Sequence, residues 1–543
     1  MNSQSSGLAV AAREGHSRTS IYSDTDVLIV GAGPVGLTLA LLLAKRGRRV
    51  AVYERWGSAY PLPRAAAMSH ETVRTFQSAG VLEQLRPLLN LSVGSRSAPC
   101  YAPDGEVLMV MSFPGIGESG YPPMAGFHQP DVDEALGDAC DAEPLIELHR
   151  GWDVRAIEQD EDGAIVTFDP FEAGAKASGD SVSARAKFVV GCDGANSSVR
   201  DLMDTEVTDT GFHSTWICID TVPLGGFSVP EPLSTYMDPT RPTLLAPTGF
   251  GRQRFEFMTI EGDDLEQIVE LDSIMTLLKP WGVTAENSEI HRRAIYTFRG
   301  RWAENWRDGR VLLAGDAAHQ IPPFLGQGLN SGARDAMALA WRLDFILGGS
   351  AGPDLLDSYT SERSYHVKQI IDASVFFGRM MCTTDPVAAE ERNKMLRMVR
   401  ENPEMAPPQP EWRLGPGCLM PDDPAAGFLA IQAQVEKDGR TGLLDDLIGP
   451  GHFVLFGNGI NPLAGLSDEA RRIWARLDGL GITIGADGYR DVDGSYTAWF
   501  EKLGAKIVLA RPDFQVFGAS AKAEDADALV KTLSECLQPE LVA

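Results

Sequence analysis

The chain has 543 residues, which is more than one hydrophobic core usually serves, so we expect two or three domains. Its 44% hydrophobic and 23% charged residues are typical of a globular protein. The formal net charge of −27 argues against nucleic acid and against an anionic membrane surface as partners.

The cysteines are scattered along the chain, without a CxxC pair and without the spacing of metal ligands. An odd, dispersed set is more typical of a reducing cytosol than of a disulfide framework. We therefore expect a cytoplasmic protein with no metal site. All seven cysteines are interpreted as buried apolar thiols: Cys100, Cys140, Cys192, Cys218, Cys382, Cys418 and Cys536.

The N-terminal 22 residues are polar and without periodicity, which predicts a disordered arm. The uncharged run at 27–44 has the length of a membrane span, but it contains Gly-Ala-Gly-Pro in its first half. We expect instead a strand at 26–30, a glycine turn, a helix to about Arg46 and a strand at 49–53. This order is the opening βαβ unit of a doubly wound sheet.

The glycine turn GAGPVG has the spacing of a dinucleotide-phosphate site. Gly31 permits the tight turn, Gly33 lets the backbone approach a pyrophosphate, and Gly36 lets the helix pack closely on the strand. Pro34 suits the first turn of a helix, whose free N–H groups favour phosphate. Glu54 ends the next strand, where its carboxylate can accept both ribose hydroxyls. The motif alone does not distinguish FAD from NAD.

Two later motifs also follow short apolar strands. The first is CDGANSSVR at 192–200, in which Asp193-Gly194 taken alone could be a simple turn. The second is GDAAH at 315–319, where Asp316 can hydrogen-bond a flavin ribityl chain. A glycine-rich loop and a new helix follow, with Asn330 as the expected helix cap. The positive end of that helix would favour negative charge on a reduced flavin.

The rest of the chain divides by pattern. Aromatic and β-branched runs between 211 and 260 predict an antiparallel sheet inserted into the nucleotide-binding part. The basic residues 291–293 are interpreted as a solvated strand edge. Helical periodicity dominates from 326 to about 400, and 402–410 is a proline-rich linker. Residues 411–543 are expected to form a separate α/β domain.

The three motifs in this order resemble those of the group A flavoprotein monooxygenases, the FAD-dependent aromatic hydroxylases of the phenol hydroxylase superfamily. The segments GAGPVGLTLALLLAKRG, CDGANSSVR and GDAAHQIPPFLGQGLNSGARDAMALAWRL look most like the subgroup of 3-(3-hydroxyphenyl)propionate hydroxylases and polyketide hydroxylases. The resemblance implies an α/β fold in three parts. These are a Rossmann-like FAD-binding domain (23–90, 126–200 and 290–400), an inserted antiparallel-sheet substrate domain (91–125 and 201–289) and a thioredoxin-like domain (411–543). Without CxxC the last domain cannot perform dithiol chemistry, so packing or dimerisation is its expected role.

The resemblance also implies roles for single residues. Arg64 corresponds to an arginine near the FAD pyrophosphate, and Gln129 to a glutamine beside the flavin. Asp193 corresponds to a residue that serves both FAD and NADPH. The expected cofactor-binding set is Gly31, Gly33, Pro34, Gly36, Glu54, Arg55, Arg64, Gln129, Asp193, Gly194, Asp316, Pro323, Gly326, Gln327, Gly328, Leu329 and Asn330.

The reaction implied is hydroxylation of a phenolic ring. NADPH or NADH reduces FAD, dioxygen adds at the flavin C4a carbon, and the hydroperoxide transfers OH to the ring, while the protein positions the reactants and excludes water. The loop at 322–328 is expected to face the flavin, and the inserted sheet to supply the pocket. The candidate lining residues are His213, Trp216, Tyr236, Arg254 and Phe324, and the candidate catalytic set is His213, Tyr236, Arg254 and Pro323.

Several alternatives remain open in the sequence. Arg254 could meet a substrate carboxylate or pair with an acid of the chain, and His319 is more typical of a structural histidine than of a base. The substrate could be a polycyclic polyketide. A flavin-dependent halogenase would carry a Trp-x-Trp-x-Ile-Pro signature, which RWAENWR at 301–307 does not match. A flavoprotein without turnover is a further alternative. No phenol-deprotonating base is evident, and the family suggests a homodimer.

Overall fold

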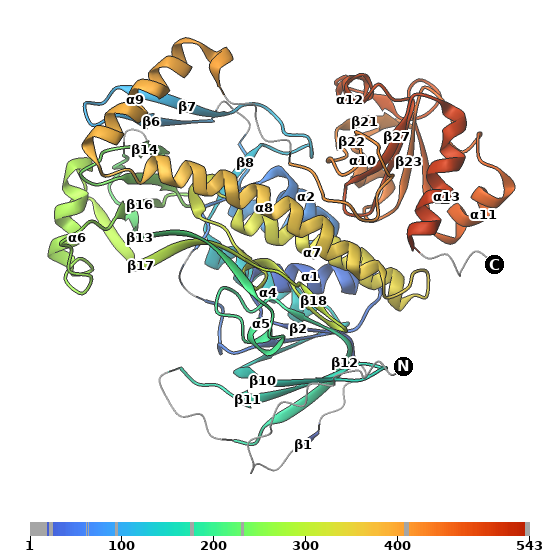
Figure 1. Ribbon diagram of the computed structural model, residues 1–543, viewed down its shortest axis with the longest axis horizontal. Helices are drawn as coiled ribbons and strands as arrows, with labels where there is room; N and C mark the ends of the chain where they lie inside the picture. Colours follow the sequence, from blue (N-terminus) through green and yellow to red (C-terminus); the bar gives the residue numbers. More distant parts are fainter. Residues whose placement is uncertain are drawn as a thin grey trace, which may run out of the picture.

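The computed structural model describes residues 19–20, 25–60, 62, 64–92, 96–173, 179–229, 233–406 and 412–537. It has a mixed α/β fold (Figure 1). Within the predicted arm only Thr19–Ser20 are described, and they form strand β1 against β12, so the arm is ordered at that point. The residues before them lie outside the described part.

A nine-stranded sheet forms the centre of the N-terminal half. Strands β2, β3, β9 and β19 and the end of β12 run parallel, whereas β10 and β11 join as an antiparallel extension. The order is β10 (Trp152–Gln159), β11 (Ala164–Pro170), β12 (Val182–Gly191), β2 (Thr25–Val30), β3 (Val50–Glu54) and β9 (Ile146–Arg150), with β19 (Val311–Leu313) beside β12 and β18 (Arg307–Asp308) beside β19.

The apolar run at 27–44 forms a strand, a turn and a helix, as predicted. Residues 27–30 of β2 are buried, as is nearly all of α1 (Pro34–Lys45), which packs against the helices α4 (Gln129–Ala142) and α7 (Gly328–Leu347). Among the residues that the structure describes, no helix is both long and apolar enough to cross a membrane. Smaller elements on this side are β4 (Ala67–Ser69), α2 (His70–Ala79), α3 (Leu82–Leu85), β5 (Leu89–Asn90), β8 (Met124–Phe127) and α5 (Ser198–Leu202).

The predicted antiparallel strands lie in a second sheet of eight strands. Its pairs are antiparallel except for β14 with β6. The order is β20 (His319–Gln320), β17 (Ser288–Ala303), β13 (Val207–Pro223), β16 (Gln253–Met258), β15 (Thr243–Pro247), β14 (Ser234–Tyr236), β6 (Arg96–Tyr101) and β7 (Val107–Phe113).

The two faces of this sheet differ, because side chains alternate along each strand. The outer face carries a hydrophobic cluster that includes Phe255 and Phe257 and packs with α6 (Leu271–Leu278). The opposite face, here called the inner face, carries Trp216, Arg254 and Glu256. It is turned toward the flavin-type motifs, since Arg254 Nη1 donates to the carbonyl of Arg64 at 2.8 Å.

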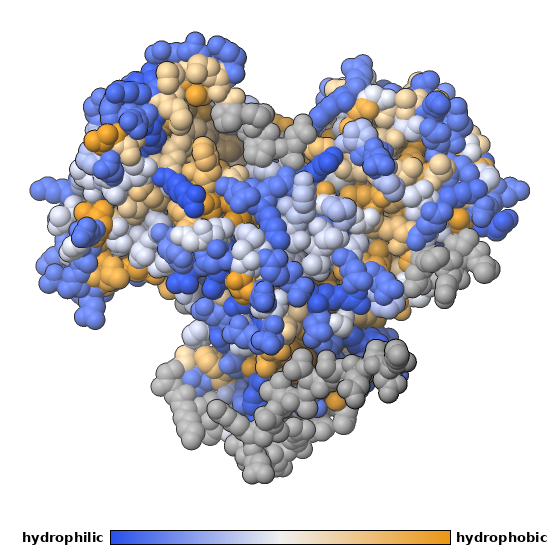
Figure 2. Space-filling model, in the orientation of Figure 1, coloured by the Kyte–Doolittle hydropathy of each residue, from blue (hydrophilic) through white to orange (hydrophobic). Residues whose placement is uncertain are grey.

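Two long helices cross the molecule in Figure 1: α7, and α8 (Leu355–Met381), which packs against it. Helix α9 (Pro386–Glu401) lies against β7. The linker predicted at 402–410 contains the short 3₁₀ helix Pro403–Met405, and its last residues lie outside the described part. On the face drawn in Figure 2, hydrophilic residues predominate and hydrophobic ones are scattered.

The C-terminal residues form a separate lobe in Figure 1. Its sheet has the order β24-β23-β26-β27, with β23 and β24 parallel and the other pairs antiparallel. The elements follow as β21 (Gln434–Lys437), β22 (Arg440–Leu443), α10 (Leu444–Ile448), β23 (Val454–Asn458), α11 (Asp468–Arg476), β24 (Leu480–Ile484), β25 (Arg490–Asp491), α12 (Ser495–Leu503), β26 (Ile507–Ala510), β27 (Val516–Ser520) and α13 (Ala526–Leu537).

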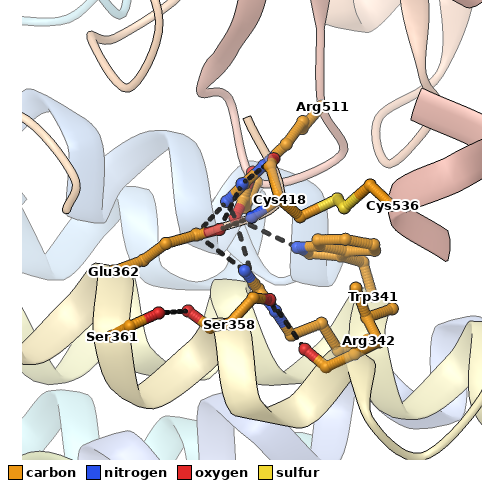
Figure 3. Close-up of a disulfide and its surroundings, with 10 residues drawn as sticks. Trp341, Arg342, Ser358, Ser361, Glu362, Cys418, Arg511 and Cys536 are labelled. Atoms are coloured by element: carbon orange, nitrogen blue, oxygen red, sulfur yellow. Dashed lines mark hydrogen bonds and ion pairs between the residues drawn. A yellow bond between two sulfur atoms is a disulfide. The ribbon is translucent and has the colours of Figure 1, made fainter. Parts of the chain in front are cut away.

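One prediction about this lobe is wrong. Cys418 and Cys536 form a disulfide across 118 residues of sequence, so not all seven cysteines are free thiols (Figure 3). The pairing depends on the chain returning to bring the two Cα atoms within 5.5 Å, and no local pattern records that approach. The remaining five cysteines are free, and four of these are buried.

The lobe docks on α7 and α8 through buried charges. Glu362 on α8 accepts hydrogen bonds from Arg511 at 2.8 and 3.0 Å and from Arg342 on α7 at 2.7 Å. Asp513 accepts from Arg511 and, at 3.0 Å, from the indole of Trp341. Figure 3 shows Glu362, Arg511, Arg342 and Trp341 converging beside the disulfide. A buried ion pair needs such multiple hydrogen bonds to offset its desolvation.

Candidate active site

The three glycine-rich motifs meet at one edge of the nine-stranded sheet. Gly191 at the end of β12 lies opposite Val30 at the end of β2 and opposite Leu313 at the end of β19. Because these strands are parallel, the loops that follow them leave the sheet on the same side. In doubly wound sheets this carboxyl edge is where ligands bind. The register therefore brings together the motifs that were predicted to share a ligand.

The glycine turn has the geometry of a phosphate site. Gly31 has a φ of +109°, and a Cβ there would lie 2.4 Å from the carbonyl oxygen of Cys192. A Cβ on Gly36 would lie 2.1 Å from the carbonyl oxygen of Gly31. At Gly33, by contrast, no described atom lies within 4 Å of the Cβ position, and α1 begins at the next residue. The backbone is thus open to a ligand just where the N–H groups of the helix point.

Glu54 lies beside this turn at the end of β3. Its carboxylate accepts from the amide of Ala32 at 2.8 Å and from the amide of Trp56 at 2.9 Å, so it braces the turn. Arg55 is half-buried, and its positive charge opposes the effect of burial, which raises the pKa of Asp153. Both predicted residues thus lie at the end of β3, on the carboxyl edge of the sheet where the three motifs meet, here called the flavin edge after its predicted ligand.

Gln129 holds the segment that carries Arg64. Its Oε1 accepts from the amides of Arg64 at 2.9 Å and Ala65 at 2.8 Å, and its Nε2 donates to Asp133 at 3.2 Å. The Arg64 guanidinium is exposed, 4.8 Å from the ring centre of Tyr60 and close to Gly194. Burial raises the pKa of Asp133 to about 7, against the lowering effects of Gln129 and Arg64.

The Asp193 carboxylate is engaged within its own loop. It accepts from the hydroxyl of Ser197 at 2.5 Å and the amide of Val199 at 3.1 Å, and burial raises its pKa. Three side chains converge on the carbonyl of Ala195: Arg200 and Arg301 at 3.3 Å and Gln320 at 2.7 Å. Arg200 also donates to the carbonyl of Ala317 at 3.2 Å, which ties this loop to the third motif.

Asp335 on α7 anchors the third motif. This carboxylate accepts from the amide of Gly315 at 2.9 Å, from His319 Nε2 at 2.7 Å and from Arg363 at 2.9 Å. His319 is thus buried in a structural role, as expected. Asp316 is half-buried, and within the described part of the chain its carboxylate has no hydrogen-bond partner, so it is available to a ligand.

The loop after this motif is more open than its neighbours. Pro323 and Gly326 are exposed, and no described atom lies within 4 Å of a Cβ placed on Gly326 or Gly328. Leu329 is half-buried, whereas Gln327 faces its own loop and Arg334. Phe324 is the buried residue of the 3₁₀ turn Pro323–Leu325, and its ring centre lies 6.0 Å from that of Trp216, so the loop packs on the inner face of the second sheet.

A helix begins near Asn330, as predicted, but Asn330 is not its cap. Helix α7 begins at Gly328 rather than at Asn330, whose Oδ1 accepts from the amide of Ser69 at 2.9 Å and the hydroxyl of Thr72 at 2.7 Å. Its Nδ2 donates to the carbonyl of Gly326 at 2.7 Å. Asn330 therefore ties the loop to α2 instead of capping a helix, because the tertiary contact satisfies its side chain.

The predicted pocket residues do not all come together. Tyr236 lies on the outer face, where its ring centre is 5.7 Å from that of Trp281, the same tryptophan that contacts Phe255 and Phe257. Because side chains alternate between the faces of a sheet, Tyr236 lies on the face opposite to that of Arg254. The His213 side chain is 45% exposed, 3.6 Å from Asp209. Neither residue lies with Trp216 at the loop.

Arg254 pairs with an acid of the chain, the second of its two interpretations. Its Nε and Nη2 donate to Asp220 at 2.7 and 3.1 Å. Arg292 donates to the same carboxylate at 3.0 Å and is buried, so its predicted place on a solvated strand edge is wrong. Three further acids were not predicted from the sequence: Glu256, Asp335 and Asp133. The spacing of Glu256 two residues after Arg254 on one strand was the only available signal.

Family models match two parts of the chain. One described as "FAD binding domain" matches residues 24–374, and one described as "HcaD C-terminal domain" matches residues 427–536. Among solved structures, the flavin-dependent monooxygenase PieE is similar with a TM-score of 0.79 and 21% identity, over 95% of this chain and 99% of that one. This likeness concerns the fold.

Two curated relatives are similar along nearly their whole length. The "Probable NADH-specific resorcinol 4-hydroxylase" of Rhodococcus jostii is 35% identical over 525 residues, 95% of each chain. The "3-(3-hydroxy-phenyl)propionate/3-hydroxycinnamic acid hydroxylase" of Mycolicibacterium smegmatis is 34% identical, over 91% of this chain and 90% of the relative.

The converging motifs and the fold define an FAD-binding oxidoreductase. The chain belongs to the FAD-dependent aromatic monooxygenases, the hydroxylases that take their electrons from a nicotinamide cofactor.

Proposed function

We propose that this enzyme hydroxylates a small phenol with NADH as electron donor. The observation that carries the proposal is the full-length match, at 35% and 34% identity, to two hydroxylases whose names specify phenolic substrates, one of them NADH-specific. The similarity to aklavinone-11 hydroxylase, at 23% identity, supports the fold only, so a polycyclic polyketide is the less supported substrate.

FAD, when bound, accepts hydride from the nicotinamide and activates dioxygen. We infer that Gly33 and the start of α1 hold its pyrophosphate, Glu54 its ribose and Asp316 its ribityl chain. The open backbone at Gly33 and the unpartnered Asp316 support this assignment. Residues 323–330 would form the wall beside the flavin ring, held by the bonds of Asn330 to α2.

The phenol would bind between this wall and the inner face of the second sheet. The contact of Phe324 with Trp216 supports the location, since it brings the loop and the inner face together. The nicotinamide cofactor is an anion, and in a chain of net charge −27 it would approach through the arginines near the flavin edge, Arg64, Arg200 and Arg301.

The domain organisation is part of the same proposal. Residues 201–289 with 91–125 form a substrate domain inserted into the FAD-binding domain, and the β24-β23-β26-β27 order supports a thioredoxin-like C-terminal domain. We also propose a cytoplasmic location, where NADH is available, and a homodimer. The dimer is tested by light scattering of the FAD-loaded protein, with a monomer mass as the contrary result.

The activity is tested by NADH oxidation with FAD-loaded protein. Resorcinol and 3-(3-hydroxyphenyl)propionate should accelerate NADH oxidation, NADPH should be a poorer donor, and the product should gain the mass of one oxygen atom. Anhydrotetracycline serves as the polycyclic comparison. If neither small phenol stimulates oxidation, the proposal is wrong; if only the polycycle does, the substrate assignment is wrong.

A further inference from the structure

The inner face of the second sheet carries an acid with no assigned role. Glu256 lies on β16 between Arg254 and Met258, paired with Cys218 on β13, while Met258 pairs with Trp216. It therefore lies one pair of residues, roughly 7 Å, along the same face from the tryptophan that contacts Phe324 of the flavin-side loop. Glu256 thus lies on the sheet face that borders the space proposed for the phenol.

Asp220 is the other carboxylate of this face, and its oxygens are already occupied. Arg254 donates to both of them, and Arg292 adds a third bond at 3.0 Å. Burial opposes its ionisation, but the two arginines outweigh that effect and lower the pKa of Asp220. A carboxylate held by three charged hydrogen bonds is a poor proton acceptor.

Glu256 has a different environment. It forms a long ion pair with Arg254, whose Nη1 is 3.7 Å from a Glu256 oxygen and donates its hydrogen bond to the carbonyl of Arg64. Burial and the charge of Asp220 raise the pKa of Glu256, while Arg254, Arg292 and the thiol of Cys218 lower it by less. The side chain retains 11% exposure, so it is not sealed in the sheet. Among the described residues of the inner face, it is the acid with capacity for a further hydrogen bond.

We propose that Glu256 binds the ring hydroxyl of the substrate and acts as the base that removes its proton. The inference rests on the proposed function and names the group that activates the phenol. A deprotonated oxygen pushes electron density into the ring carbon that is hydroxylated, so a base at this position accelerates the transfer. General bases of this kind contribute about 10²-fold to 10⁴-fold.

The step is balanced without further groups. The overall reaction converts a phenol, dioxygen, NADH and a proton into a diphenol, water and NAD⁺. In it Glu256 takes one proton from the phenol oxygen, the oxygen–hydrogen bond breaks and a carboxyl oxygen–hydrogen bond forms. When the ring regains its aromaticity, the hydroxylated carbon loses its hydrogen as a proton to solvent, and Glu256 returns its own proton to the phenol oxygen, so the product is neutral. Glu256 is neither oxidised nor reduced.

Binding is measured first, without NADH, from the change in FAD absorbance when ligand is added. Glu256→Gln should weaken resorcinol binding roughly 5-fold to 10-fold, because a charge-assisted hydrogen bond becomes a neutral one. Binding of the dimethyl ether of resorcinol, which has no hydroxyl to donate, should be unchanged. Glu289→Gln is the matched control, since Glu289 is an exposed glutamate of the same sheet.

Turnover is then measured against the acidity of the substrate. Glu256→Gln should lose at least about 10²-fold in kcat with resorcinol at neutral pH. The loss should shrink with fluorinated resorcinols, and at higher pH, because these phenols ionise without a base. The kcat of wild-type protein and of Glu289→Gln should depend much less on the acidity of the phenol. If Glu256→Gln does not retain FAD, Glu256→Ser is the second variant, and its kcat must show the same dependence on phenol acidity.

The results separate the two proposals. Wild-type protein that no phenol stimulates contradicts the proposed function, and the inference with it. Wild-type hydroxylation with an unchanged Glu256→Gln profile overturns the inference alone. The inference is also overturned if Glu256→Gln loses the same factor in kcat with all phenols and binds the dimethyl ether more weakly. That pattern indicates a structural role.

Discussion

The buried carboxyl groups near the flavin edge differ in how many donors each of them meets. Asp335 accepts from an amide, a histidine and an arginine. Asp133 accepts only from Gln129, and its Oδ1 has no partner among the described residues. Burial without compensation favours the neutral acid, so the pKa of Asp133 rises to about 7. Its protonation state therefore changes near neutral pH, next to the residue that holds Arg64.

Asp133→Asn should reduce the pH dependence of stability. The folded pKa of about 7 exceeds the unfolded value of 3.8, so between these values the folded protein binds more protons and loses stability as pH rises. The loss amounts to at most about 4 kcal/mol. The variant should therefore gain stability relative to wild type between pH 5 and pH 8, as measured by urea unfolding. An identical pH dependence in the two proteins would contradict the assigned pKa.

At the scale of elements, the start of α7 organises the third motif. The first turns of this helix contribute Asn330, which holds α2, and Asp335, which holds Gly315. The segment between β19 and α7 has little regular hydrogen bonding of its own: two short 3₁₀ turns, Gly315–Ala317 and Pro323–Leu325, and the two-residue strand β20. Side chains from α7 supply the hydrogen bonds that hold these loops, so the helix and the flavin edge form one structural unit.

Asp335→Asn should weaken both folding and FAD binding. The change leaves Arg363 as an uncompensated buried charge, a loss of about 3–5 kcal/mol in the free energy of unfolding. FAD dissociation, followed by fluorescence, should accelerate because Gly315 loses its anchor. Asp357→Asn on α8 is the control: its carboxylate is 73% exposed and pairs with Arg307, so the loss should stay below about 1 kcal/mol. Equal effects of both changes would refute the anchoring role.

Features with local causes were predictable from sequence. Gly36 is constrained by the carbonyl oxygen of Gly31 in its own turn, and Gly31 has a positive φ that favours glycine, so the spacing of the glycines records both constraints. The apolar run of β2 predicted a buried strand for the same reason. The pairing of Arg254 with Asp220, the outward side of Tyr236 and the disulfide all depend on which distant segments meet. A linear pattern does not specify such tertiary contacts, and for the same reason Glu256 was not predicted.

On the scale of the whole molecule, the C-terminal lobe is fixed by several independent contacts. Arg511 and Asp513 reach α7 and α8 through buried charges, and Arg74 of α2 pairs with Asp445 at 2.7 Å. The disulfide ties Cys418, whose amide donates to Glu362 at 2.7 Å, to the end of α13. The lobe and the helices behind the flavin edge are therefore coupled.

Removal of the disulfide should lower stability without abolishing the fold. It closes a loop of 118 residues, and its loss should cost about 2–5 kcal/mol because the unfolded chain gains freedom. Urea unfolding of wild-type protein, with and without reductant, measures the difference. Cys536→Ser should match the reduced wild type and not respond to reductant. Cys140→Ser, at a free cysteine, controls for the substitution itself. No effect of reductant on wild-type protein would contradict the bond.

The flavin edge is assembled from strand ends at residues 30, 191 and 313, which lie far apart in the chain. Two loops of more than a hundred residues must close before these ends can pair. Loop closure is slow, and its entropic cost is offset only once the contacts have formed. The edge therefore completes late in folding, and FAD binds only the completed edge. Bound cofactor then stabilises the native state by mass action. We therefore expect a larger yield of folded protein when flavin is supplied during synthesis.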